Sequence, residues 1–217
     1  MKLARPDIRH PRIVLAGVEK DDAGLVTALR KRGLHARWMS WEDADTLHAD
    51  LVILRESGHD RRAEFLAWTK RVAHLLNAPN VVAWNLGRRY LRDLENAGVP
   101  TAKASNSAIA LVFFAGGQSH AFTAQGAVDA DFELWDVGHA ALRAAARQLR
   151  IDIDELLYAR ADVTDDARLV RLDLVAPRFG WELLDNATRQ DAQRQFAIAV
   201  ESALERLGLG PLSHRRP

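Results

Sequence analysis

The feature that most constrains the fold is an alternation of short apolar runs with longer amphipathic stretches in the first half of the chain. The run Arg-Ile-Val-Leu-Ala-Gly at residues 12–17 is typical of a buried parallel strand. The first amphipathic stretch begins at a helix-capping pair, Asp21 and Asp22, and stops at Gly33 behind two cationic residues. The pattern predicts strands at residues 12–17, 34–41, 51–54 and 81–84, and helices up to residue 33, at 64–76 and at 88–97. This order favours an open sheet covered by helices, which is Rossmann-like although it lacks a Gly-x-Gly-x-x-Gly motif.

The composition and the pattern of predicted elements change after residue 101. Residues 101–108 are small and polar and are typical of a linker or short loop. Beyond them we expect a hairpin over 110–125 that turns at Gly116 and Gly117, a helix over 134–149, strands at 156–163 and 169–175, and a final helix capped by Asn186. The prediction is therefore an α/β protein with two domains: a Rossmann-like domain at residues 1–101 and a smaller α+β domain at residues 102–217.

Charge and composition exclude several classes of function. Thirty basic residues balance twenty-nine acidic ones, which disfavours a dedicated nucleic-acid binder. Cysteine is absent, so disulfides, Cys-ligated zinc and iron–sulfur clusters are excluded. No apolar run approaches the roughly 20 residues that span a bilayer, and residues 1–7 lack the apolar core of a signal peptide. We expect a cytoplasmic protein with neither nucleic acid nor membrane as a partner.

Several motifs together resemble a known family. In the first half they are Leu-Val-Ile-Leu-Arg at 51–55, Phe-Leu-Ala-Trp at 65–68, Leu-Leu-Asn-Ala-Pro at 75–79, Val-Ala-Trp-Asn at 82–85, Arg-Tyr-Leu at 89–91 and Gly-Val-Pro-Thr at 98–101. Their order and spacing resemble the N-terminal half of the ATP-grasp ligases, in particular the bacterial group that includes the cycloserine-biosynthesis ligase. The resemblance implies that residues 1–101 are a pre-ATP-grasp domain and residues 102–217 a reduced remnant of the ATP-grasp catalytic domain.

The second half resembles the family only in parts. Residues 110–121 resemble its central hairpin, residues 157–162 its strand with an arginine and the first magnesium carboxylate, and residues 171–177 its strand with the other acidic ligands. Between residues 101 and 110 the family has a mobile lid with a Lys-Pro strand, a glycine-rich loop and an adenine hinge. Residues 122–126 offer no cation, and Arg88 stands in place of a lysine. The ATP clamp therefore looks excised.

The resemblance implies roles for three residues of the predicted strands. Asp162 and Asp173 are the candidate metal ligands, and Arg160 is a candidate catalytic and substrate-binding residue that faces an anionic group. Carboxylates on adjacent antiparallel strands lie about 5 Å apart when in register, close enough for a weak magnesium site. The alternative is a solvated strand face on which these residues and Arg171 pair with one another at ~0.2–1 kcal/mol each.

His120 is the candidate general base, and the alternative is an ordinary hydrogen-bonded histidine. Ser119 precedes it, and adjacent side chains on a regular strand point to opposite faces, so the two are not expected to pair.

Arg55, Glu56 and His59 follow the third predicted strand at the carboxyl end, where open α/β sheets bind ligands. Together with Tyr90 and Arg160 they form the predicted substrate-binding set, and a plain polar loop is the alternative. Trp181 is expected to cap the shortened fold, or together with Trp135 to form a partner-binding patch.

These observations lead to three alternative hypotheses about the function. The first is a degenerate ATP-grasp protein that does not use ATP and binds, or acts without ATP on, a small amino-acid-like or carboxylate metabolite in a biosynthetic pathway. The second is a non-catalytic interaction subunit, either a homodimer or the partner of a full-length ligase, with the final helix as its interface. The third is an active minimal carboxylate–amine ligase, which alone would need ATP and magnesium; otherwise no cofactor is expected.

Overall fold

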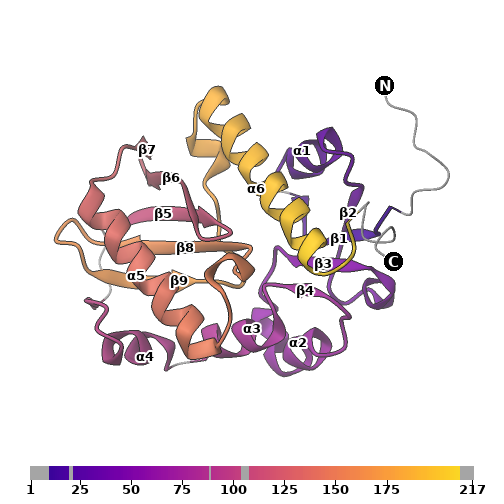
Figure 1. The fold of residues 1–217 in the computed structure, drawn as a ribbon, viewed down its shortest axis with the longest axis horizontal. Coiled ribbons are helices and arrows are strands. Elements are labelled where there is room, and N and C mark those ends of the chain that lie inside the picture. Colours follow the sequence, from indigo (N-terminus) through magenta and orange to yellow (C-terminus); the bar gives the residue numbers. More distant parts are fainter. Residues whose placement is uncertain (1–9, 20–21, 88, 104–107, 211–217) are drawn as a thin grey trace.

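The computed structural model describes residues 10–19, 22–87, 89–103 and 108–210. Two sheets lie side by side and the C-terminal helix packs between them (Figure 1). The fold is mixed α/β with one parallel and one antiparallel sheet, which confirms the predicted fold class at this level. Among the described residues, no helix is both long enough and apolar enough to cross a bilayer.

Sheet A is parallel and comes from the first half of the chain. Its strands are β1 (Ile13–Ala16), β2 (Ala36–Met39), β3 (Leu51–Leu54) and β4 (Leu75–Leu76), in the order β2-β1-β3-β4. The helices of this half are α1 (Leu25–Lys31), α2 (Arg62–Thr69), α3 (Pro79–Asn85) and α4 (Tyr90–Asn96). All residues of β1 and β3 are buried, because helices or other chain segments cover both faces of the central strands.

One predicted strand is wrong. Residues 81–84 were expected to form the fourth strand, but they lie within helix α3, which has Pro79 at its start. Proline is favoured at the first helical position because its missing N–H would have no helical partner there. The fourth strand is instead Leu75–Leu76, from the end of the predicted 64–76 helix. A short apolar run does not by itself distinguish a buried strand from a buried helix.

Sheet B is antiparallel and comes from the second half. It contains β5 (Ile109–Phe114), β6 (Gly117–Thr123), β7 (Gly126–Val128), β8 (Tyr158–Val163) and β9 (Leu169–Asp173), in the order β7-β6-β5-β8-β9. The predicted hairpin is confirmed as β5 and β6, but its turn is centred on Ala115 and Gly116, both with positive φ, and Gly117 begins β6. Helix α5 (Phe132–Leu149) covers one face (Figure 1).

The final helix, α6 (Asn186–Arg206), packs against α1 and against β5 and β6. Its N-cap is Asp185, whose side chain accepts hydrogen bonds from the backbone N–H groups of Ala187 and Thr188, so the prediction of Asn186 as cap is wrong by one residue. Helix α1 also lacks the predicted aspartate cap: Gly24 precedes it, Asp22 is buried, and Asp21 lies outside the described residues. Short 3-10 helices occupy Ala44–His48, His59–Arg61, Ile153–Glu155 and Trp181–Leu183.

Buried polar contacts and a shared apolar core join the two sheets. The amide of Asn77, next to β4, donates to the carbonyl oxygens of Tyr158 (2.9 Å) and Leu174 (2.7 Å). One apolar cluster runs from Leu15 of sheet A through Phe196 of α6 to Val112 of sheet B. All strands of sheet A precede residue 101, and all strands of sheet B follow it. Helix α6 packs on both halves of the chain. The predicted domain division at residue 101 therefore stays a prediction.

Candidate functional site

A cleft of about 720 Å³ lies over the face of sheet B opposite α5. Successive side chains of a strand point to opposite faces of the sheet, so α5 and the cleft receive different residues. The face that packs against α5 presents Leu111, Ala159 and Ala161, and the face that lines the cleft presents Ala110, Arg160 and Asp162. We call this space the sheet-B cleft. Its apolar lining includes Ile109, Phe122 and Leu183, and its charged lining consists of Arg160, Asp162, Asp165, Arg178 and Glu182.

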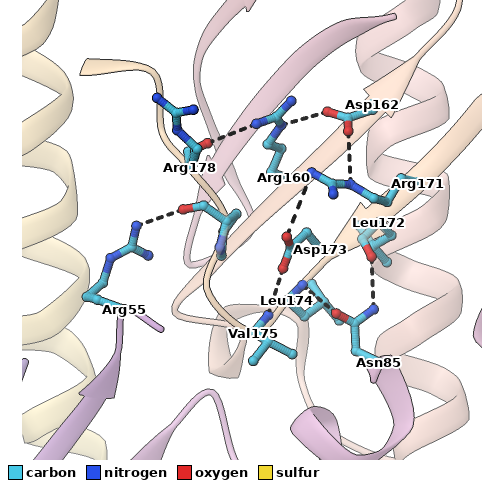
Figure 2. A network of polar contacts seen from close by, with 11 residues as sticks. Arg55, Asn85, Arg160, Asp162, Arg171, Leu172, Asp173, Leu174, Val175 and Arg178 are labelled. Carbon is cyan, nitrogen blue, oxygen red and sulfur yellow. Dashed lines mark hydrogen bonds and ion pairs between the residues drawn. The ribbon is translucent and has the colours of Figure 1, made fainter. Parts of the chain in front are cut away.

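The charged residues of β8 and β9 form a connected row, the arginine–aspartate ladder: Arg160, Asp162, Arg171 and Asp173 (Figure 2). The Arg160 Nε donates to Asp162 Oδ1 at 2.6 Å, and the Arg171 Nε donates to Asp162 Oδ2 at 3.1 Å. A longer contact of 3.9 Å joins Arg171 to Asp173. The strand register places Asp162 opposite Arg171 and Asp173 opposite Arg160, so each carboxylate faces a cation.

This ladder does not fit the magnesium ion that the family resemblance implies. Both oxygens of Asp162 accept from arginines, and Asp173 Oδ1 accepts from the backbone N–H of Val175 at 3.1 Å. A guanidinium beside each carboxylate repels a second cation and occupies the oxygens that a hard metal needs. Within the described part of the chain, no group of three or more Asp, Glu or His side chains could hold a metal ion. The geometry is that of the self-neutralised strand face.

Arg55, a predicted substrate-binding residue, is instead buried in the protein. Its side chain is 2% exposed, and its Nε and Nη2 donate to the two oxygens of Asp22 at 2.6 and 3.1 Å. Its Nη2 also donates to the carbonyl oxygen of Pro177 at 2.7 Å (Figure 2), and the guanidinium lies 4.0 Å from the ring centre of Phe179. Trp181 Nε1 donates to Asp22 as well. Arg55 therefore ties the end of β3 to residues 177–181 rather than lining the sheet-B cleft.

The other predicted substrate residues are dispersed. Glu56 and His59 line a separate depression of about 340 Å³ near the ends of β2 and β3, where Glu56 accepts from the backbone N–H of Trp41 at 3.3 Å. Tyr90 begins α4 and stacks edge-on against Trp84. Burial raises the pKa of the Tyr90 hydroxyl, partly offset by the backbone of Leu172 and the charge of Arg171. Of the predicted set, only Arg160 lines the sheet-B cleft.

His120 is a buried core histidine, as its alternative interpretation proposed. Its Nε2 lies 2.7 Å from the carbonyl oxygen of Phe179, and because a carbonyl only accepts, Nε2 carries the proton. Its Nδ1 then accepts from the Ser119 hydroxyl at 3.0 Å. Burial lowers the pKa of the imidazole against the opposing effect of the Phe179 carbonyl, which favours the neutral form of the ring.

The contact between Ser119 and His120 contradicts the expectation that the two side chains diverge. Val112 pairs with His120 and Phe113 with Gln118, so Ser119 is an extra residue in a β-bulge. A bulge breaks the strict two-residue alternation and brings neighbouring side chains together. The His120 ring is enclosed among aromatic side chains, including Trp181 at 5.5 Å between ring centres, rather than facing the sheet-B cleft.

Sequence reasoning missed three charged residues of the cleft. Arg178 and Glu182 form an ion pair of 2.8 Å on the segment that follows β9, and Arg160 Nη1 lies 3.4 Å from the Arg178 carbonyl oxygen. Asp165 lines the cleft from the turn between β8 and β9. The four-residue spacing of Arg178 and Glu182 is a signal for an ion pair but not for a cleft, because their segment reaches the sheet only in the folded chain. Trp181, predicted as a cap or as part of a partner-binding patch, is 2% exposed and packs in the apolar core, so it does not form an exposed patch.

Comparisons with known proteins agree with this fold. Residues 7–77 match the family described as the N-terminal domain of D-cycloserine synthetase DcsG. The cycloserine biosynthesis protein DcsG of Streptomyces lavendulae is 37% identical over 90 residues, which cover 38% of this chain and 30% of that protein. The match therefore spans less than a third of the curated relative.

Solved structures extend the likeness over most of the chain. The crystal structure of D-cycloserine synthetase DcsG superposes with a TM-score of 0.73 at 22% identity, covering 90% of this chain and 99% of that one. A D-alanine–D-alanine ligase from Bacillus anthracis, crystallised with ATP, superposes with a TM-score of 0.58 at 11% identity, covering 91% and 98%. At these identities the likeness concerns the fold. The chain thus shares the fold of these ATP-grasp ligase structures, and its residues 7–77 are similar to the N-terminal domain of DcsG.

Proposed function

We propose that this chain binds a small zwitterionic carboxylate of the amino-acid type in the sheet-B cleft, without using ATP, as part of a biosynthetic pathway. The domain assignments belong to the same proposal: a Rossmann-like pre-ATP-grasp domain up to residue 101 and a shortened catalytic-type domain after it. The observation that carries the proposal is the double engagement of Asp162 by Arg160 and Arg171.

The ladder supports the loss of ATP use. Phosphoryl transfer depends on positioning and on neutralising phosphate charge, tasks that bound magnesium and cationic side chains perform. Here the carboxylates at the positions that resemble metal ligands are neutralised by arginines of the same sheet. Only residues 102–108 separate Thr101 from β5, where the resemblance implies a phosphate-gripping lid. These residues therefore supply neither free carboxylates for magnesium nor a lid that grips the phosphates.

The cleft's charges support a zwitterionic ligand. Arg160 and Arg178 can receive a carboxylate, and Asp165, which has no ion pair to another described residue, can receive an ammonium group. Phe122 and Leu183 provide an apolar wall for a short side chain. A volume of about 720 Å³ is within the range of small-metabolite sites.

The first experiment is isothermal titration calorimetry of the full chain with ATP and magnesium, with ATP turnover measured alongside. We expect no binding heat up to millimolar nucleotide and no turnover. Micromolar binding, or turnover that Asp162→Asn abolishes, would overturn the proposal and establish a minimal ligase.

The second experiment screens the ligand class by thermal shift and calorimetry. The probes are amino acids, the matching hydroxy acids and the matching amines, so that each charged group is tested separately. We expect the amino acids to bind best, and Arg160→Gln to weaken binding by at least about tenfold. Arg206→Gln, which removes a surface ion pair with Asp154 outside the lining of the cleft, is the matched control. Equal binding by all three classes would contradict a zwitterion site.

A further inference from the structure

A second concave surface lies between α1 and α6, a groove of about 910 Å³ that the proposed ligand site does not use. The small residues of its lining, which we call its floor, include Ala23, Gly24, Ala28 and Ala187. The lining also carries four cations, which we call its rim: Lys31, Arg32, Arg189 and Arg194. We call it the basic groove. Gly24 marks the point of close approach, since a Cβ there would lie 2.9 Å from the Gln193 amide of α6.

The groove keeps a positive excess after its internal ion pairs are counted. Residues 23–41 hold four basic residues and neither Asp nor Glu. On the rim, Arg32 pairs with Glu201 and Arg194 with Asp191 at 3.1 Å. The Arg189 guanidinium donates a hydrogen bond to the neutral Asn186, and no ion pair to a described residue involves Arg189 or Lys31. A partner for this groove should therefore be acidic and should carry an apolar group for the floor.

The chain itself carries such a surface. Residues 126–142 hold four acids and neither Lys nor Arg, and all four acids are exposed: Asp129, Asp131, Glu133 and Asp136. In their midst stands Phe132, the first residue of α5, with 73% of its surface exposed. Aromatic residues are enriched at protein–protein interfaces, where an exposed ring surrounded by charges can become buried. We call residues 129–136 the acidic tip.

We propose that the acidic tip of one copy of this chain docks into the basic groove of a second copy. The Phe132 ring would lie on the alanine floor, and the surrounding acids would meet Lys31, Arg189 and Arg194. In Figure 1 the start of α5, beside β7, lies apart from α1, on the other side of the central helix α6, so one copy does not satisfy its own groove, which α1 and α6 line. Because the two surfaces differ, the contact is head-to-tail, and the pair keeps one free groove on one copy and one free tip on the other.

The test is sedimentation velocity of the full chain over a concentration series up to about 100 µM. We expect species larger than the monomer that grow with concentration and weaken at high salt, since exposed charges are screened. Phe132→Ser should remove the association, and so should the double variant Lys31→Glu and Arg194→Glu. Val18→Ser, which removes another exposed apolar side chain, is the matched control and should associate as the parent does.

Mixing separates this contact from other kinds of association. The tip variant still has an intact groove and the groove variant an intact tip, so an equimolar mixture should form a one-to-one complex and nothing larger. Circular dichroism establishes that each variant is folded before it is mixed. A parent that stays monomeric at low salt, variants that associate like the parent, or a mixture that stays monomeric would each overturn the proposal. The result does not depend on the proposed ligand or on ATP.

Discussion

Two arginine–aspartate sites in this molecule show how burial changes the meaning of the same pair of groups. The pair of Arg55 and Asp22 is almost wholly buried, with side chains 2% and 5% exposed, and joins sheet A to the segment after β9. In the ladder, Arg160 and Arg171 are 18% and 48% exposed, and they share Asp162 at the edge of the cleft. The buried pair stabilises the junction of the two halves; the ladder sets the charge of a surface open to ligands.

The largest effect should come from breaking the buried pair. Arg55→Ala leaves the Asp22 carboxylate without its cation in a buried site, so the free energy of unfolding should fall by about 3–5 kcal/mol. Urea denaturation measures the loss. Replacing both partners, as Arg55→Met with Asp22→Leu, should recover much of it because no lone charge then remains buried. A single variant as stable as the parent would show that the junction does not depend on this pair.

A smaller effect, visible only as a pH dependence, should come from His120 in the same junction. Burial lowers the pKa of its imidazole, so the unfolded state binds protons more readily than the folded state. Its contribution to stability is therefore present above the unfolded pKa of about 6.5 and is lost as the pH falls below that value. Denaturation midpoints from pH 8 to 5 measure the slope, and His120→Gln should flatten it. An unchanged slope in this variant would place the titration at another histidine.

The smallest effect on stability is expected in the ladder. Arg171→Gln removes a half-exposed partner of Asp162 and should change the free energy of unfolding by about 0.2–1 kcal/mol. The combined variant Arg160→Gln and Arg171→Gln frees both carboxylates, and we expect it to gain weak, millimolar magnesium binding in calorimetry that the parent lacks. Magnesium binding by the parent would contradict our interpretation that the arginines block the site.

Several features of the site could be predicted because they depend on local periodicity. Arg160 and Asp162 are two residues apart on a strand, so they share a face wherever that strand lies. For the same reason, the sequence could offer pairing between these arginines and aspartates as the alternative to a magnesium site. The expected divergence of Ser119 and His120 failed because a bulge shifts the register at that point, and no local pattern marked it.

Other features depended on chain segments far apart in the sequence. The role of Arg55 depends on Asp22, Pro177 and Trp181, and Arg178 enters the cleft only because its segment folds back over sheet B. The register of the strands and the path of the segment after β9 are decided by packing across the whole core, in which many weak contacts act together. The sequence by itself determined the strand faces, most of the helices and the absence of cysteine chemistry. Only the tertiary structure decided the partners of Arg55 and the place of Arg178, since these depend on contacts between distant segments, such as that of Arg55 with Pro177, which lies 122 residues away in the sequence.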